Sequence, residues 1–196
     1  MIRSKSNFYD IICNLYPLVD QVLLPQKRRL IKEINRLPTG RLLELGVGTG
    51  RHCKDYGKHQ VTGIDNSAGM LRTARCNGRD NITLIRMDAE KLSFKAATFD
   101  YVVISHVLAV VDNPEKVLQE THRVLKTGGK LFVLNHFTPR NPLRYLDLCF
   151  RYFSKLLRFR SVFYLHGLKG LRKFALQEEI SLWPVGYFKL LIFQKC

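Results

Sequence analysis

The chain has 196 residues, of which 46% are hydrophobic, so it is long enough and apolar enough for one domain with a substantial core and is not a disordered chain. Its 32 basic and 16 acidic residues give a formal net charge of +16, which favours a negatively charged partner. Nucleic acid, an anionic membrane surface and an acidic substrate all remain open. Five scattered cysteines without a CxxC pair argue against a disulfide framework or a zinc site and indicate reduced thiols in the cytosol.

The N-terminal part of the chain is predicted to be helical. Apolar residues recur at three- and four-residue steps over 7–37, and Pro17 and Pro25 are expected to divide this stretch into short helices. In "QKRRLIKEINRL" the apolar residues lie on one side and the basic residues on the other. Asp10, Asn14 and Pro17 interrupt the apolar part of 1–17, which argues against a signal peptide, and we expect no transmembrane helix.

Strands and helices then alternate along the chain. The predicted strands are 41–45, 60–65, 81–88, 99–106 and 130–137, and the predicted helices are 67–76, with Ser67 as N-cap, and 113–126, with Pro114 in its first turn. A last helix over 167–177 and a β-hairpin over 179–195 complete the prediction. Such alternation is typical of an α/β fold with a mostly parallel sheet covered by helices on both faces. Ligands of these sheets bind beyond the carboxyl ends of the strands.

A glycine-rich loop follows the first predicted strand. The stretch "LLELGVGTGRH", residues 42–52, holds Gly46, Gly48 and Gly50. A tight connection between strand and helix would explain these glycines without any ligand. If the loop binds a nucleotide, a dinucleotide is one candidate ligand. Its fingerprint is G-x-G-x-x-G, however, whereas the spacing here is G-x-G-x-G. S-adenosylmethionine is the competing ligand.

Acidic residues favour S-adenosylmethionine. Glu44 lies in the first strand, and Asp65 and Asp88 end the second and third strands. S-adenosylmethionine has no phosphate, but its ammonium group, ribose hydroxyls and adenine amine are hydrogen-bond donors that suit carboxylates. Each acid alone is more typical of an ordinary strand end, whereas three in successive strands indicate one binding site.

These motifs resemble the class I S-adenosylmethionine-dependent methyltransferases of the type 11 group. The similar stretches are "LLELGVGTG", "VTGIDNSAGML", "MDAEKLSFKAATFDYVVISHVL" and "HRVLKTGGKLFV". The resemblance implies a Rossmann-like, seven-stranded sheet with an antiparallel C-terminal hairpin. The cofactor-binding positions that it implies are Glu44, Gly46, Val47 and Gly48 for the methionine part, Asp65, Asn66 and Met70 for the ribose, Asp88 and Ala89 for the adenine, and Ser105 beside the sulfonium. Val47 departs from the small residue often found there.

The methyl acceptor has to be inferred from other residues. An amine acceptor must lose a proton, and His106, His136 and Tyr9 are the candidates for catalysis, with Tyr16 and Asn135 as candidates for binding the acceptor. Helix capping or a local hydrogen bond would equally explain His106, and helix packing would explain the tyrosines. No residue pattern indicates a metal.

The segment 140–174 is strongly basic and contains one acid, Asp147. Its basic residues and its Phe and Leu residues alternate at helical spacing, which is typical of an amphipathic helix at a membrane interface or of a helix packed on its own domain. Nucleic acid is a less favoured partner, because "SHVLAVVDNP" lacks the Asn/Asp-Pro-Pro-aromatic run of many nucleic-acid amino-methyltransferases.

A closer resemblance concerns the acceptor. The stretches "FYDIICNLYPLVD", "SHVLAVVDNPEKVLQETHRVLKTGGKLFVLNHF" and "WPVGYFKLLIFQK" are similar to the soluble bacterial phospholipid N-methyltransferases. This resemblance implies N-methylation of phosphatidylethanolamine by a cytoplasmic protein on the inner face of a membrane. A small soluble metabolite, methylated on N or O, is the alternative acceptor, and a non-catalytic, cofactor-binding partner subunit is a further alternative. The expected organisation is one domain, 1–196, with a helical cap (1–37), a cofactor-binding core (38–137), a substrate- and membrane-facing insertion (138–166) and a last helix and hairpin (167–196).

Overall fold

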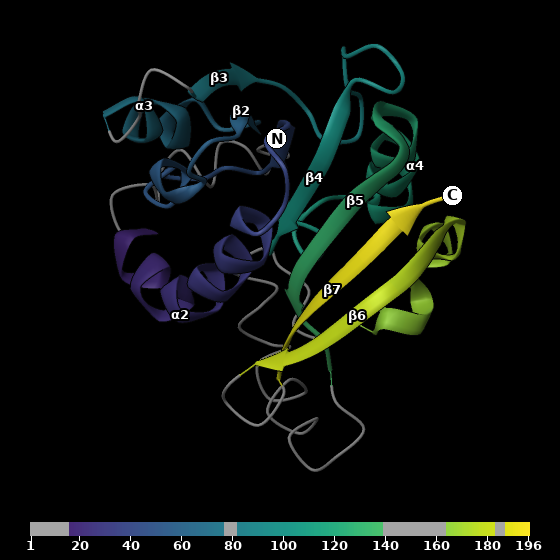
Figure 1. Cartoon of the computed structure of the whole chain (residues 1–196). Helices are drawn as coiled ribbons and strands as arrows, with labels where there is room; N and C mark the ends of the chain where they lie inside the picture. The colour runs from purple at the N-terminus through teal and green to yellow at the C-terminus, as the bar shows by residue number, and fades with distance from the viewer. Residues whose placement is uncertain (1–15, 77–81, 139–163, 183–186) are drawn as a thin grey trace, which may run out of the picture.

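The computed structural model describes residues 16–76, 82–138, 164–182 and 187–196, which form one sheet with helices on both faces (Figure 1). Its seven strands run in the order β3-β2-β1-β4-β5-β7-β6. They are β1 (Arg41–Leu45), β2 (Gln60–Asp65), β3 (Ile82–Arg86), β4 (Phe99–Ser105), β5 (Leu125–His136), β6 (Phe174–Leu182) and β7 (Phe188–Lys195). The first five are parallel to one another, whereas β7 is antiparallel to β5 and to β6. The predicted fold class is therefore confirmed, and the strand order reverses between β1 and β4.

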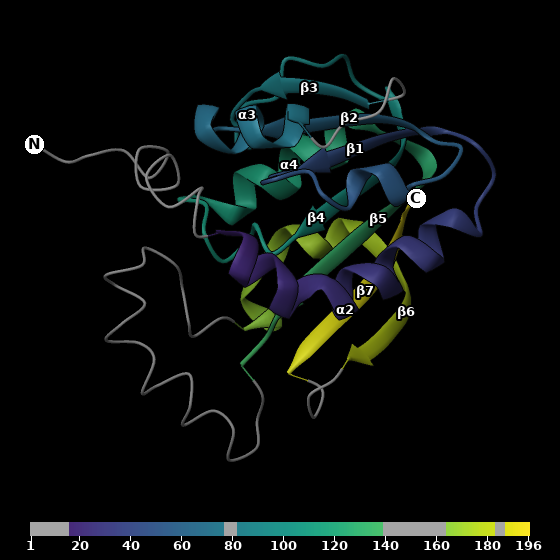
Figure 2. The same cartoon turned by 90° about the vertical axis from the view of Figure 1, so that its left-hand side faces the viewer.

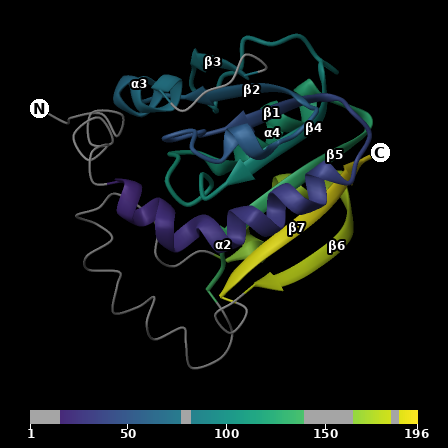
Figure 3. The same cartoon turned by 60° about the vertical axis from the view of Figure 1, so that its left-hand side comes forward.

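Two cores lie on opposite faces of this sheet. Helices α2 (Tyr16–Asn35) and α3 (Ala68–Cys76) cover one face, together with the short helix η1 (Cys53–Asp55). Helix α4 (Pro114–Val124) covers the other face, with η3 (Lys169–Lys173) against it. Figures 2 and 3 show α2 running across the sheet in front of β5 and β7. No helix in the described ranges is long and apolar enough to cross a membrane.

The predicted break of the N-terminal helix at Pro25 was wrong, whereas a helix does start beside Pro17, at Tyr16, as expected. Helix α2 runs without interruption from Tyr16 to Asn35 and contains both Pro17 and Pro25. Pro17 stands in the first turn, where a backbone N–H has no partner in the helix in any case. Pro25 has no N–H for the carbonyl of Gln21, and both residues lie on the exposed side of the helix. The expected helices before residue 16 lie outside the described residues, as does most of the predicted insertion, 139–163.

The predicted helix starts are confirmed. The Ser67 Oγ accepts a hydrogen bond of 3.1 Å from the backbone N–H of Met70, which places Ser67 as the N-cap of α3. At α4, the side chain of Asn113 accepts a hydrogen bond of 3.2 Å from the backbone N–H of Lys116, and Pro114 follows as the first helical residue.

The predicted helix over 167–177 was wrong. Only the short helices η2 (Leu165–Gly167) and η3 form, and β6 begins at Phe174. Strand β6 pairs with β7 over its whole length, and Phe174 packs against the ring of Phe193 at a centroid distance of 6.4 Å. Pairing with β7 thus outweighs the helical propensity of the sequence "FALQEE".

Candidate cofactor and acceptor site

The glycine-rich loop turns sharply at the carboxyl end of β1. Gly46, Gly48 and Gly50 have φ angles of +69°, +60° and +65°, a region that favours glycine. A Cβ atom on Gly46 would lie 2.3 Å from Cγ2 of Val107, so a side chain there would collide with the segment after β4. The loop is tied to β2 by a hydrogen bond of 2.9 Å from the N–H of Val47 to the carbonyl of Ile64. These contacts hold the loop close to the ends of β2 and β4.

A cavity lies beside this loop at the carboxyl ends of β1, β2 and β4. Its walls include most of the residues that the sequence assigned to the cofactor. Those brought together there are Gly46, Gly48, Asp65, Asn66, Met70, Asp88, Ala89 and Ser105, joined by the acceptor candidate His106. The structure does not bring Glu44 or Val47 to the cavity wall, because both side chains are buried on the α2 face of the sheet.

The two cavity carboxylates that the sequence assigned to the cofactor, Asp65 and Asp88, are held by backbone hydrogen bonds. Asp65 accepts one from the N–H of Gly48 and one from the N–H of Ser67, both at 2.9 Å. Asp88 accepts one of 2.9 Å from the N–H of Glu90. A carboxylate oxygen can accept a second hydrogen bond, so both side chains suit the hydroxyl and amine donors of a nucleoside. The buried Ser105 Oγ has no hydrogen-bond partner among the described residues. Together these groups fit S-adenosylmethionine.

His106 adds a neutral imidazole to the cavity wall. Its backbone has a φ of +59°, and its N–H donates a hydrogen bond of 2.7 Å to the carbonyl of Leu134. Burial, and then the positive charges of Lys27, His136 and His52, lower the pKa of His106 to about 3. The buried Nε2 atom has no hydrogen-bond partner among the described residues. An imidazole in this state accepts hydrogen bonds and is uncharged at neutral pH.

The low pKa of His106 predicts that the protein loses stability in mild acid. The unfolded chain binds a proton at this residue near pH 6.5, whereas the folded ring stays neutral down to about pH 3. The unfolded state therefore binds more protons, and this residue should lower the free energy of unfolding by about 2 kcal/mol between pH 6.5 and 4.5. Urea unfolding of wild type and of His106→Asn, which tolerates a positive φ, measures the difference. Equal pH dependence of the two proteins would contradict the prediction.

The other predicted acceptor residues lie apart from the cavity wall or outside the description. The ring of His136 stacks on Tyr187 at 5.6 Å, and Asn135, only 1% exposed, donates a hydrogen bond of 2.8 Å to the carbonyl of His136. Neither lines the cavity. Tyr16 begins α2 and its side chain is not described, and Tyr9 lies outside the described residues. Their predicted roles stay predictions.

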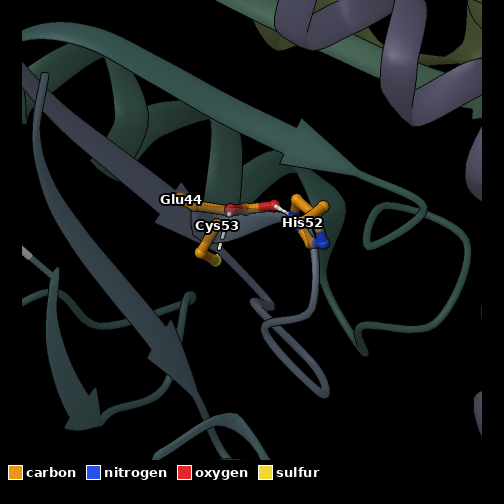
Figure 4. A group of neighbouring side chains, drawn as sticks. All are labelled: Glu44, His52 and Cys53. Carbon is orange, nitrogen blue, oxygen red and sulfur yellow. Dashed lines mark hydrogen bonds and ion pairs between the residues drawn. The ribbon is translucent and has the colours of Figure 1, made fainter. Parts of the chain in front are cut away.

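A buried polar cluster on the α2 face was missed by the sequence analysis. The Glu44 carboxylate, fully buried, accepts a hydrogen bond of 2.6 Å from Nε2 of His52 and one of 3.5 Å from the thiol of Cys53 (Figure 4). The Nζ atom of Lys27 lies 3.5 Å from Nδ1 of His52. The sequence contained a signal for Lys27, since its spacing from Leu30, Ile31 and Ile34 places it on their apolar stripe.

The electrostatics of this cluster favour an ionised Glu44 carboxylate. Burial would raise the pKa of Glu44, but the ion pair and hydrogen bond with His52, together with the charge of Lys27, hold it below its ordinary value. Burial and the neighbouring Glu44 raise the pKa of the Cys53 thiol. Ligand atoms of Glu44, His52 and Cys53 lie within 4.8 Å of one another. A protonated thiol and a nearby ammonium group nevertheless suit a hydrogen-bonded cluster better than a metal centre.

The site combines a glycine-rich loop after β1 with carboxylates at the ends of β2 and β3, beside the point where the strand order reverses. This arrangement is typical of a nucleoside-binding α/β enzyme. The chain belongs to the S-adenosylmethionine-dependent methyltransferases, and a family described as "Methyltransferase domain" matches residues 43–133. S-adenosylmethionine is therefore its cofactor, and the enzyme class expected from the sequence is confirmed.

Two relatives and one solved structure are similar to most of this chain. The chain is 35% identical to a phosphatidylethanolamine N-methyltransferase of Cereibacter sphaeroides, over 86% of each protein. It is 33% identical to a ubiquinone/menaquinone biosynthesis C-methyltransferase of a Geobacter species, over 80% of this chain and 70% of the relative. An S-adenosylmethionine-dependent methyltransferase structure from Thermotoga maritima has the same fold, with a TM-score of 0.76 and 22% identity over 98% of this chain and 100% of that one.

Proposed function

We propose that this methyltransferase N-methylates an amine-bearing phospholipid such as phosphatidylethanolamine at an anionic membrane surface. The observation that carries this proposal is the similarity to the phosphatidylethanolamine N-methyltransferase, which extends over 86% of both proteins. A net charge of +16 supports it, because basic residues near an anionic bilayer strengthen association. A location on the inner face of a membrane is part of the proposal.

The cavity wall suits an amine acceptor. S-adenosylmethionine supplies an electrophilic methyl group, which an attacking nitrogen takes with its lone pair. An amine with an ordinary pKa of about 10 is mostly protonated at neutral pH and must lose its proton first. A histidine with a pKa of about 3 is too weak a base to hold that proton, so we assign His106 the role of accepting a hydrogen bond from the neutral nitrogen and orienting it.

The quinone methyltransferases are the relatives that favour a second acceptor class. They are 32–34% identical to this chain, and a quinone precursor would be methylated on carbon. Such an acceptor carries no amine and no phosphate. A small soluble amine is the remaining alternative.

Methyl transfer from radiolabelled S-adenosylmethionine distinguishes these acceptors. We expect label in the lipid of phosphatidylethanolamine vesicles, at a rate that rises when anionic lipid is added. Parallel reactions contain a demethylated quinone in neutral vesicles, or a lipid-free extract of small metabolites. Label in the quinone or in the extract, with none in phosphatidylethanolamine, would overturn the proposal and identify the acceptor class.

A further inference from the structure

A smaller cavity lies between α2 and the glycine-rich loop. It is lined by Gln21, Leu24, Lys27, Arg51 and His52. Lys27 is only 8% exposed, whereas Gln21 and Arg51 are exposed at the rim. Two cations, an amide and an imidazole thus face one small space.

None of the described residues that line this cavity is acidic. Glu44 is fully buried behind His52 and is already bonded to that ring and to the thiol of Cys53. The two cations of the wall, Lys27 and Arg51, therefore face this space without an acidic side chain in the described lining. Arg and Lys together are the side chains that bind phosphate groups most strongly, Arg through its planar fork and Lys as a point charge.

This cavity is close to the cofactor site. Arg51 directly follows Gly50 of the glycine-rich loop. Gly46 and Gly48 of the same loop line the cofactor cavity, and Arg51 and His52 line the smaller cavity. An anion held between Lys27 and Arg51 would therefore lie beside the loop that forms part of the cofactor cavity.

We infer that the cavity between Lys27 and Arg51 is a phosphate-binding subsite for the methyl acceptor. The inference rests on the proposed function and deepens it: the acceptor is an amine that carries a phosphate a few bonds from its nitrogen. In an ethanolamine headgroup the two groups are separated by a short chain of two carbons and an oxygen, which suits neighbouring subsites. The phosphate can belong to a phospholipid headgroup or to a soluble phosphoamine, and the test separates these sources.

Equilibrium binding tests the subsite without any methyl transfer. Inorganic phosphate is titrated by calorimetry into wild type, Arg51→Gln, Lys27→Gln and the control Arg28→Gln, whose exposed side chain lies next to Lys27 in sequence but outside the cavity. We expect about tenfold weaker binding for Arg51→Gln, the loss of one charge-assisted interaction, and wild-type binding for Arg28→Gln. Arg51→Gln is the decisive variant, because an exposed side chain is replaced without disturbing the core. Wild-type phosphate affinity in Arg51→Gln would overturn the inference.

Kinetic measurements then test the phosphate-binding subsite and the proposed function independently of each other. The acceptors are phosphatidylethanolamine vesicles, O-phosphoethanolamine and ethanolamine. We expect Arg51→Gln to raise the KM for a phosphate-bearing acceptor about tenfold and to leave any reaction with ethanolamine unchanged. Methylation of vesicles with equal KM in wild type and variant would reject the subsite and keep the function. Phosphate binding that depends on Arg51, without methylation of any phospholipid, would keep the subsite and reject the function.

Discussion

Replacing Asp65 by alanine is expected to weaken S-adenosylmethionine binding about a hundredfold. The substitution removes the carboxylate that is proposed to accept hydrogen bonds from the ribose hydroxyls. It also removes the acceptor of the backbone N–H groups of Gly48 and Ser67, both at 2.9 Å, and so loosens the loop and the start of α3 together. Calorimetric titration of S-adenosylmethionine measures the change.

The control for this variant is Asp55→Ala, which removes an exposed acid from η1, outside the cofactor cavity. It should bind the cofactor as wild type does. Thermal unfolding without ligand shows whether Asp65→Ala still folds. A folded Asp65→Ala protein with wild-type affinity would contradict both the placement of the ribose and the role of the strand-end carboxylate.

Replacing His52 by alanine is expected to cost about 3 kcal/mol of folding stability, because it leaves a buried carboxylate without its main partner. His52 is 3% exposed and Glu44 fully buried, and their atoms approach to 2.6 Å. Denaturant unfolding at neutral pH gives the free energy, provided that the variant unfolds in a single cooperative step.

A double-mutant cycle separates this ion pair from simple loss of packing. Once Glu44→Gln has removed the charge, His52→Ala should cost clearly less than it does in the wild-type protein. Additive losses in the single and double variants would mean that the two side chains do not act as a pair. Because the pair lies beside the glycine-rich loop, the same variants also report whether S-adenosylmethionine affinity depends on it.

Local patterns predicted the part of the fold that binds the cofactor. Period-two and apolar runs located β1, β2 and β4, and the glycine spacing located the loop whose positive φ angles the structure shows. Ser67 and Asn113 cap the helices that they precede in sequence. These features depend on neighbours in sequence, so the sequence alone is informative about them.

Features that depend on distant residues were missed. The residues after Phe174 favour a helix by composition, and only pairing with β7 makes them a strand. Glu44 was assigned to the cofactor on its position in β1, but strand alternation turns its side chain to the α2 face, where His52 and Lys27 meet it. Lys27 was placed on the basic, outer side of its helix, yet it is buried. The spacing of Lys27 from the apolar residues of α2 did indicate its burial, whereas the partners of Glu44 could be identified only from the fold.

One outer strand of the sheet, β6, affects how readily two copies of the chain could pair edge to edge. Strand β6 is the last in the order, so one of its edges has no partner strand among the described residues. The adjacent residues Glu178 and Glu179 point to opposite faces of that strand, and Lys189 of β7 engages Glu179 at 2.6 Å. Charged side chains on an edge strand disfavour its pairing with a further strand, most strongly where like charges meet. We therefore expect Glu178 to disfavour extension of the sheet at this edge by a second copy of the strongly basic chain.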